Sequence, residues 1–229
     1  MLSNIVERTI KIVAVSDTHM YHGKLTDKII KANADVLVHC GDMTDSGSID
    51  ELSKVIEWLG MIKKKGYAND VCVIAGNHDR ALENSASLDA KMVDLGIDYL
   101  QDSGTSYKGF RFYGSPWTHG LRSWGFQYDN VHGPGSAVWD KIPENTDVLI
   151  THSPPIRTLS RDQSDWGCPH LKRRVDEIAP MAHLFGHVHS QHGILRTEKT
   201  LFVNASSWTS EMRIMNDPIV FSLRKFVSL

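Results

Sequence analysis

Five short apolar runs in this chain each end in a loop that opens with aspartate, asparagine or histidine, and this pattern constrains the fold more than any other feature. Runs of this length, bounded by polar or glycine-containing turns, are typical of buried strands. Because the carboxyl ends of strands form the binding edge of an open α/β sheet, we expect the five loops to converge. The runs are residues 10–15, 35–40, 71–75, 147–151 and 182–185, and the polar residues that follow them are Asp17, His19, Asp42, Asp45, Asn77, His78, Asp79, His152, His187 and His189.

Helical patterns separate the early strands, whereas strands follow one another late in the chain. Residues 48–65 carry apolar side chains at helical spacing, with Ser48 as the N-cap and Gly66 as the stop. Weaker helical patterns cover residues 81–95 and 171–178, and further strands are expected at 110–113, 193–195, 201–203 and 219–223. This order predicts an α/β domain with a mixed sheet or a pair of sheets. Because no linker interrupts the pattern, a single domain over residues 1–229 is the simpler organisation.

Composition excludes several classes of protein. A chain of 229 residues with 41% hydrophobic and 23% charged residues is neither disordered, nor collagenous, nor a coiled coil. Lysine plus arginine number 25 against 27 for aspartate plus glutamate. The net charge of −2 therefore argues against a protein that binds nucleic acid through bulk positive charge, and we expect no stable nucleic-acid partner.

The cysteines and the N-terminus indicate a soluble cytoplasmic protein. Cys40, Cys72 and Cys168 are odd in number and lack CxxC spacing, which suits a reducing compartment better than a disulfide framework. The first residues contain no apolar segment of the kind found in signal peptides. No apolar run approaches the roughly 18 residues of a membrane span. We therefore expect no membrane partner, and we leave open that the chain forms a homodimer.

The residues at the strand ends suit a catalytic metal site. They offer hard oxygen donors and imidazoles but no thiolate, a set that fits Mn²⁺, Fe or Zn²⁺. Residues i and i+2 of an extended segment point the same way, so Asp17 with His19, and His187 with His189, are expected to supply adjacent ligands. Glycines precede three of the donors and permit close backbone approach there. These glycines are Gly41, Gly76 and Gly186.

The motifs DxH, GDxxD, GNHD, a lone histidine and GHxH occur in this order, and together they resemble the calcineurin-like metallophosphoesterase superfamily. The resemblance runs over residues 10–208. Further runs (YLQDSG, KGFRFYGSPWT, WGF, THSPP, GCPHL, FGHVH and NAS) resemble a narrower branch, the metallophosphoesterase-domain-containing proteins. That branch implies an α/β fold of two mixed β-sheets packed as a sandwich and flanked by helices, four layers in the order αββα. It also implies a dinuclear metal site and phosphodiesterase activity on cyclic nucleotides.

The resemblance assigns roles to individual residues. The first metal ion would be bound by Asp17, His19, Asp42 and His189, and the second by Asp42, Asn77, His152 and His187. The two divalent ions are expected to be manganese first, with iron, zinc, nickel or cobalt as alternatives. In the implied reaction a hydroxide that bridges the metals attacks phosphorus, and His78 acts as general acid or charge stabiliser at the leaving oxygen. Asn77 and His78 would also contact the substrate. Asp45 is assigned with His78 to the catalytic residues. Both Asp45 and Asp79 would act by orienting metal ligands or by holding His78 in place.

Two other functions compete with hydrolysis of small phosphodiesters. Relatives that carry glycine in place of His187 have a weakened second metal and hold a nucleotide with little turnover, so an AMP- or GMP-binding scaffold is one alternative. The presence of His187 favours an enzyme. A phosphomonoesterase or protein phosphatase is the other alternative. The sequence GDMTDSG lacks the arginine of that group's GDxVDRG, and GNHD replaces its GNHE.

The candidate substrate-binding residues lie in an aromatic segment, residues 115–126. Three aromatic residues, Trp117, Trp124 and Phe126, lie within ten residues of one another, and they would form either part of the core or a stacking wall for a nucleobase. Trp117 and His119 are the candidates for contact with a small nucleotide or phosphodiester substrate. His39 and His183 lie within predicted strands and are expected to be buried histidines with hydrogen-bond partners rather than metal ligands.

Overall fold

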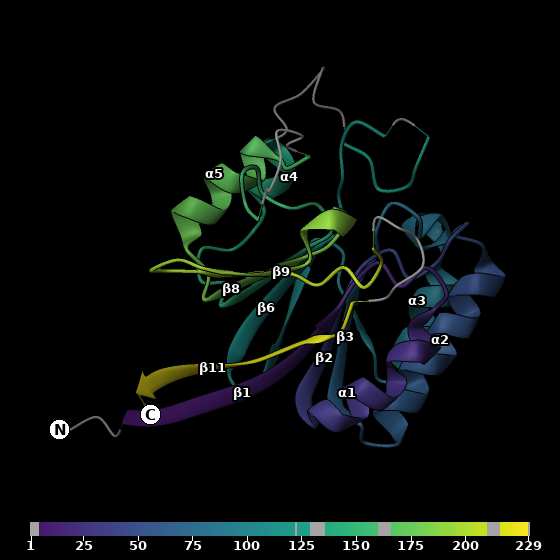
Figure 1. Ribbon diagram of the computed structural model, residues 1–229, viewed down its shortest axis with the longest axis horizontal. Coiled ribbons are helices and arrows are strands. Elements are labelled where there is room, and N and C mark those ends of the chain that lie inside the picture. The colour runs from purple at the N-terminus through teal and green to yellow at the C-terminus, as the bar shows by residue number, and fades with distance from the viewer. Residues whose placement is uncertain (1–4, 122, 129–135, 160–165, 210–215, 229) are drawn as a thin grey trace.

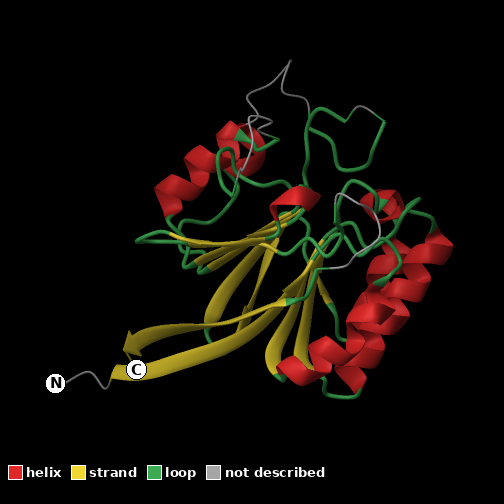
Figure 2. Ribbon diagram, in the orientation of Figure 1, coloured by secondary structure: helices red, strands yellow, loops and turns green. Residues whose placement is uncertain are grey.

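The computed structural model describes residues 5–121, 123–128, 136–159, 166–209 and 216–228. Two β-sheets lie face to face between two groups of helices, so the predicted four-layer αββα architecture is confirmed (Figure 1, Figure 2). The first sheet has the strand order β11-β1-β2-β3-β4, and only β11 runs antiparallel to its neighbour. Its strands are β1 (Ile5–Val15), β2 (Ala34–Cys40), β3 (Ala68–Ile74), β4 (Asp98–Tyr99) and β11 (Ile219–Ser228).

The second sheet has the strand order β5-β6-β7-β8-β10-β9. Its four inner strands are parallel, and the two edge strands, β5 and β9, run antiparallel to them. Its strands are β5 (Ser103–Tyr107), β6 (Phe110–Ser115), β7 (Val148–Thr151), β8 (Ala182–Phe185), β9 (Gly193–Arg196) and β10 (Leu201–Asn204).

Helices cover the outer face of each sheet. The first sheet is covered by α1 (Thr26–Ala32), α2 (Ile49–Lys64) and α3 (Ala86–Asp94), and the second by α4 (Ser136–Trp139) and α5 (Pro169–Ile178) (Figure 1). Three single-turn 3₁₀ helices, η1 (His22–Leu25), η2 (Arg80–Asn84) and η3 (His189–Gln191), lie in the connecting loops. Among the described residues, no helix has the length and apolar character needed to cross a bilayer.

The alternation of side chains along β1 shows why the chain forms layers. Ile10, Ile12 and Ala14 point into the core between the two sheets, and Val13 and Val15 point into the core beneath the helices. All five are fully buried. Burial of an aliphatic side chain of this size contributes about 1.5–3 kcal/mol, so both faces of the strand stabilise the fold.

The strongest helix prediction is confirmed and a weaker one is modified. Helix α2 follows Ser48, whose hydroxyl accepts a hydrogen bond from the Glu51 N–H at 3.3 Å, and Gly66 with φ +67° comes just after its end. The helix expected over residues 81–95 is interrupted at Ser85, whose backbone (φ −116°, ψ 85°) is not helical. The sequence pattern did not predict α1, which has only seven residues and two buried side chains and so lacks a readable periodicity.

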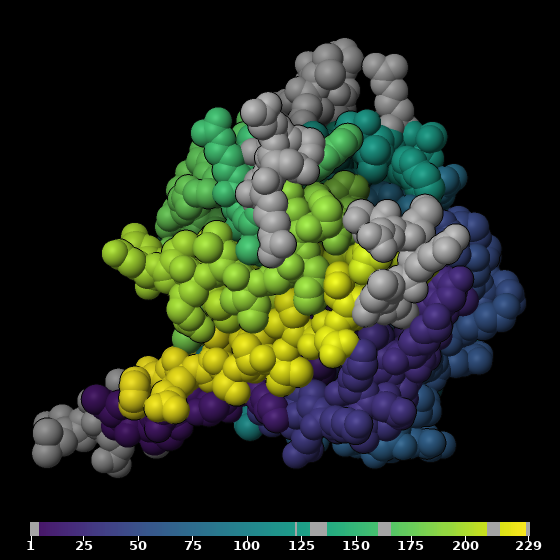
Figure 3. Space-filling model, in the orientation of Figure 1, coloured from purple at the N-terminus to yellow at the C-terminus, as the bar shows by residue number. Residues whose placement is uncertain are grey.

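One edge of the sandwich gathers the loops that carry the polar motifs. The loops after β1, β2 and β3 come from the first sheet, and those after β7 and β8 come from the second. The two sheets are joined here by a bridge between Ser16 and Ser206 and by the Ser207 N–H, which donates to the Ser16 carbonyl at 2.7 Å. At the far end of the molecule, the ends of β1 and β11 project from the body as a two-stranded ribbon (Figure 3).

Candidate metal centre

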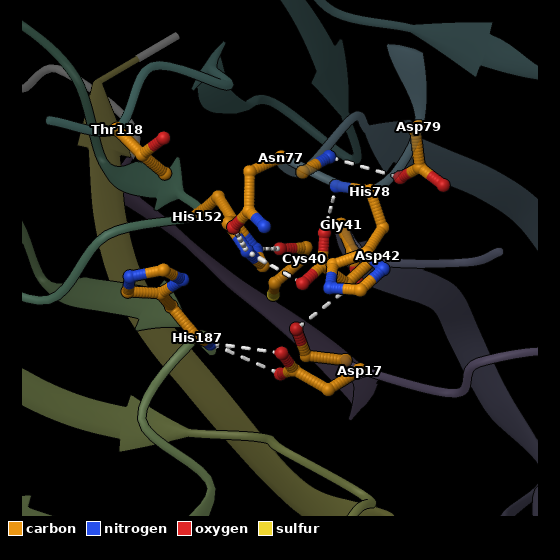
Figure 4. Close-up of polar contacts among 12 residues, drawn as sticks. Asp17, Cys40, Gly41, Asp42, Asn77, His78, Asp79, Thr118, His152 and His187 are labelled. Carbon is orange, nitrogen blue, oxygen red and sulfur yellow. Dashed lines mark hydrogen bonds and ion pairs between the residues drawn. The ribbon is translucent and has the colours of Figure 1, made fainter. Parts of the chain in front are cut away.

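The structure brings together all seven predicted metal-binding residues. Three groups of acidic and histidine side chains overlap, and within each group one possible ligand atom per residue lies within 4.8 Å of the others. His19 and Asp42 each occur in two groups, so the three groups form one connected set. Asn77 adjoins the last group, with Oδ1 at 3.1 Å from Nε2 of His152 (Figure 4). The groups are Asp17 with His19 and His189; His19 with Asp42 and His78; and Asp42 with His152 and His187.

Backbone carbonyls fix the tautomers of two histidines in this site. Nδ1 of His19 lies 3.1 Å from the carbonyl oxygen of Thr44, and Nδ1 of His152 lies 2.9 Å from that of Cys40. A carbonyl oxygen only accepts, so each Nδ1 carries a proton, and Nε2 is the ring nitrogen that each histidine would offer to a cation once it is unprotonated. Nε2 of His19 is buried and has no hydrogen-bond partner within the described residues. An unpaired buried nitrogen is costly, and a cation bound there would satisfy it.

Two buried aspartates give the site its negative charge. Burial alone would raise the pKa of Asp17, but its hydrogen bond with His189 at 3.3 Å holds that pKa well below the usual range. Burial likewise opposes ionisation of Asp42, whose pKa is nevertheless held low by the charge of His152, 3.2 Å away. Both carboxylates are therefore ionised at neutral pH and require cations beside them.

The histidines of the site respond to this charge in opposite directions. Burial alone would lower the pKa of His152, yet the Asp42 carboxylate raises it to about 9. The pKa of His189 is also raised, because its hydrogen bond with Asp17 outweighs burial. Burial and the neighbouring His152 lower the pKa of His187 to about 4. The raised pKa values of His152 and His189 thus favour protons beside the two aspartates in the metal-free protein, and a bound cation would displace those protons.

Glycines allow the loops to approach one another as expected. A side chain at Gly76 would collide with the Asp42 carboxylate, and a side chain at Gly186 would collide with the Asp17 carboxylate. Each position therefore needs a residue without a Cβ atom, because the backbone there packs directly against a charged oxygen.

The predicted extended geometry of the two histidine-containing pairs is wrong. Asp17, His19 and His187 have φ values of 51°, 40° and 68°, in the left-handed region, and the loops therefore turn sharply at these residues. Asp17 and His19 still fall in one group, but His187 and His189 belong to different groups. Strained backbone at donor residues is common in functional sites, since the surrounding contacts hold it in place.

Asp79 links two of the loops rather than entering the site. Its buried carboxylate accepts hydrogen bonds from the N–H groups of Gly76 at 2.9 Å and Thr44 at 3.0 Å, and from the Thr44 hydroxyl at 2.7 Å. Burial, followed by the nearby charge of Asp42, raises the pKa of Asp79. The carboxylate thereby fixes the loop after β2 against the loop after β3.

Asp45 meets His78 through its backbone. The Asp45 side chain is exposed, and its Oδ1 lies 3.4 Å from Nδ1 of His19. Its carbonyl oxygen accepts a hydrogen bond from Nδ1 of His78 at 2.6 Å. The His78 N–H donates to Oδ1 of Asp42 at 2.8 Å, so both the ring and the backbone of His78 are held beside the shared carboxylate (Figure 4).

The predicted substrate-binding aromatic residues are tied to the protein core. The Trp117 indole N–H lies 3.0 Å from both carboxylate oxygens of Asp102, and its ring lies 6.0 Å from that of Phe126. His119 is half-buried, with its ring 5.6 Å from that of Tyr128. These contacts favour the core interpretation of Trp117, and the contact of Trp117 and His119 with substrate stays a prediction.

Three further aromatic residues lie beside the site: Trp124, which the sequence offered as part of a stacking wall, and Trp208 and Tyr21, which it did not assign. The Trp124 ring is 4.1 Å from the His78 ring, and the Trp208 ring is 5.5 Å from the His19 ring. Tyr21 lies 5.2 Å from Trp208. Trp124 belongs to the WGF run and Trp208 follows the NAS run, but nothing in either run indicates which side chain it meets.

Two histidines outside the site have the environment expected of them. Nε2 of His39 lies 3.0 Å from the Thr18 hydroxyl, and Nε2 of His183 lies 2.8 Å from the Thr151 hydroxyl. Burial lowers the pKa of each to about 3, so both rings are neutral near pH 7.

Comparison with known proteins relates the chain to one family. Residues 10–191 match the family described as "Calcineurin-like phosphoesterase". Human metallophosphoesterase domain-containing protein 1 is 35% identical over an alignment that covers 93% of this chain and 71% of that protein. A UPF0046 protein of Caenorhabditis elegans is 34% identical over an alignment that covers 94% of this chain and 76% of that protein. The crystal structure of TT1561 of Thermus thermophilus shares the fold with a TM-score of 0.64 at 12% identity, over 86% of this chain and 88% of that one.

Proposed function

The chain belongs to the calcineurin-like phosphoesterase family, and we propose that it is a metal-dependent phosphodiesterase that hydrolyses small phosphodiesters, cyclic nucleotides foremost. The observation that carries the proposal is the overlap of the donor groups on Asp42, with His187 present in the second group. A complete second group supports turnover rather than the binding of a nucleotide alone.

The donor set divides into two halves around Asp42. Asp17, His19 and His189 would hold one divalent ion, and Asn77, His152 and His187 the other, with manganese proposed first for both. When bound, two such ions neutralise phosphoryl charge and lower the pKa of a bound water to roughly 7. The protein supplies neutral imidazole lone pairs and two ionised carboxylates, the donors that these ions need.

His78 is proposed to act on the leaving group. Its Nδ1–H is committed to the Asp45 carbonyl, which leaves Nε2 as the ring nitrogen available to a substrate. A protonated Nε2 at this position would donate its proton to the departing alkoxide. Asp42 accepts from the His78 backbone and so keeps the ring beside the phosphoryl site.

A phosphomonoester, the competing class of substrate, differs from a diester in charge. It carries more negative charge and would need an additional cation. Ser46 stands where the GDxVDRG motif has arginine, and its hydroxyl and N–H both donate to Glu51 at 2.9 Å. This position therefore supplies no guanidinium to a phosphoryl group, which favours the diester.

A panel of substrates tests the proposal. We expect manganese-loaded protein to hydrolyse bis-p-nitrophenyl phosphate and cyclic AMP, both 2′,3′ and 3′,5′, faster than p-nitrophenyl phosphate. Preference for the monoester would overturn the diesterase assignment. Absence of turnover on every substrate, together with tight binding of AMP, would identify a nucleotide-binding scaffold instead.

We further propose a cytoplasmic location. Cys40, Cys72 and Cys168 are buried free thiols, which supports a reducing compartment. Mass spectrometry of the protein from cells, after alkylation under denaturing conditions, would contradict this location by detecting a disulfide among them.

A further inference from the structure

We propose that Trp124 is a positioning residue that holds the imidazole of His78 in the orientation needed at the leaving group. This inference rests on the proposed function, because it assigns Trp124 a role only through His78. Trp124 comes from the connection between β6 and β7, which is not one of the five strand-end loops that supply the donors.

The indole of Trp124 lies against the catalytic histidine. The two ring centroids are 4.1 Å apart and the ring planes are inclined by 38°, which is a tilted stacking contact. The guanidinium of Arg80, two residues after His78, lies 4.8 Å from the same indole. Trp124 thus contacts two side chains of the loop after β3, and both contacts depend on an aromatic ring.

The backbone beside Trp124 is anchored to the same loop. The Gly125 N–H donates to the Asn77 carbonyl at 3.0 Å. A Cβ atom at Gly125 would lie 3.2 Å from Cα of Arg80, so the two chain segments are in close contact. The next residue, Phe126, is fully buried in the core beneath the first sheet. The position of the indole is therefore set by a rigid backbone contact and a buried neighbour.

The other contacts of His78 leave its ring incompletely fixed. The Asp45 carbonyl holds Nδ1, and the His19 ring meets the His78 ring edge-on at 4.6 Å and 83°. Neither of these contacts covers a face of the imidazole by stacking. Without the Trp124 stack, the ring can rotate about its hydrogen bond to Asp45 and carry Nε2 away from the leaving oxygen. A displacement of about 1 Å at a reacting group can cost on the order of 100-fold in rate.

The decisive test compares leaving groups. Trp124→Leu keeps apolar bulk without a ring, and Trp124→Phe keeps a ring. On 3′,5′-cyclic AMP, whose ribose alkoxide must be protonated, we expect Trp124→Leu to lower kcat by about 10- to 100-fold with little change in KM. On bis-p-nitrophenyl phosphate, whose p-nitrophenolate leaves without a proton, the loss in kcat should stay below about threefold.

Trp124→Phe should recover most of the rate on cyclic AMP. The exposed Trp166, changed to leucine, is the matched control and should match wild type on both substrates.

Two further measurements separate positioning from a structural effect. The double variant Trp124→Leu/His78→Asn should be no slower than His78→Asn alone, because Trp124 acts through His78. In NMR spectra of histidine-labelled protein, the His78 ring protons should lose the ring-current shift of the indole in Trp124→Leu and keep a shift in Trp124→Phe.

The outcomes distinguish this inference from the proposed function. Equal losses on both substrates, or additive losses in the double variant, would overturn the positioning role while the phosphodiesterase assignment stands. An unchanged His78 ring-current shift in Trp124→Leu would overturn the contact itself. If wild-type protein hydrolyses neither diester, the proposed function fails and the positioning role fails with it.

Discussion

The backbone N–H of His187 lies 3.1 Å from each carboxylate oxygen of Asp17. This contact joins the loop after β8, in the second sheet, to the loop after β1, in the first (Figure 4). Because the donor is a backbone group, it orients Asp17 whatever side chain stands at position 187. The first donor group is therefore built independently of the His187 imidazole, which contributes to the second group.

His187→Gly should remove the second metal ion and leave the first. We expect the metal content to fall from two ions to one per chain and the affinity for the lost ion to fall at least about 100-fold. The fold should persist, since φ 68° suits glycine and the N–H remains. Elemental analysis and calorimetric titration with Mn²⁺ measure this, with His170→Gln as the control histidine. Loss of both ions would contradict the independence of the two groups.

His78→Asn should retain metal and lose turnover. The side chain groups with His19 and Asp42, so a role as ligand is the competing interpretation. As a general acid, His78 is worth about 10²- to 10⁴-fold in rate, and its removal should lower kcat on cyclic AMP within that range. Elemental analysis of the same preparation decides the matter, because loss of an ion would identify His78 as a ligand.

Asp79→Asn should weaken both the fold and the metal site. An amide group cannot accept all of the hydrogen bonds that Gly76 and Thr44 donate, and an unsatisfied buried donor costs about 1–3 kcal/mol. Mn²⁺ affinity should fall about 10- to 100-fold, as for other partners that orient ligands. Urea unfolding measures the first effect and titration the second. The exposed Asp94, changed to asparagine, should show neither effect.

Binding of metal should release protons. The pKa of His152 is raised to about 9 in the metal-free protein, so this ring carries a second proton at pH 7, and the pKa of His189 is shifted in the same direction. A metal ion must displace these protons, and its affinity should therefore rise with pH up to about 9. Titration calorimetry in buffers of different ionisation enthalpy counts the released protons. An affinity that is flat between pH 6 and 9 would contradict the charge balance described for the site.

Acidification should lower the stability of the metal-free protein, because the folded state keeps the buried His183 ring unprotonated. Burial lowers its pKa from 6.5 to about 3, so the unfolded chain binds a proton in this interval and the folded chain does not. The contribution of His183 to the free energy of unfolding is complete above pH 6.5. It is lost as the pH falls toward 3, by up to about 1.4 kcal/mol per pH unit. His183→Gln should flatten the pH dependence of the free energy of unfolding in urea. An unchanged slope between pH 6 and 5 would refute this.

The sequence predicted the parts of the fold that depend on local periodicity. Strand β1 could be predicted because it contains a short apolar run bounded by polar residues, and helix α2 because its buried positions repeat at helical spacing. The candidate metal ligands could be predicted because each lies a short distance past the end of a strand, and these strand ends meet at one edge of the sandwich. The conformation of those loops was not predictable, since Asp17 and His187 adopt positive φ under contacts from other strands.

The contacts that individual side chains make between loops were not predictable from the sequence. Trp124 lies in a run without helical or strand periodicity, and its partner His78 is 46 positions away. Asp45 carries a motif carboxylate, yet it holds His78 with a carbonyl that every residue has. Such contacts depend on how two loops pack against each other, and the spacing of residues within either loop does not predict that packing.

The pairing of β1 with β11 has a consequence for synthesis of the chain. Residues 5–14 pair with residues 219–228, so one edge of β1 has no strand beside it until β11 has left the ribosome. An unpaired strand edge is prone to wrong association, and contacts this distant in sequence form slowly. The strand that presents Asp17 and His19 thus keeps one unpaired edge until β11 has been synthesised and has paired with it.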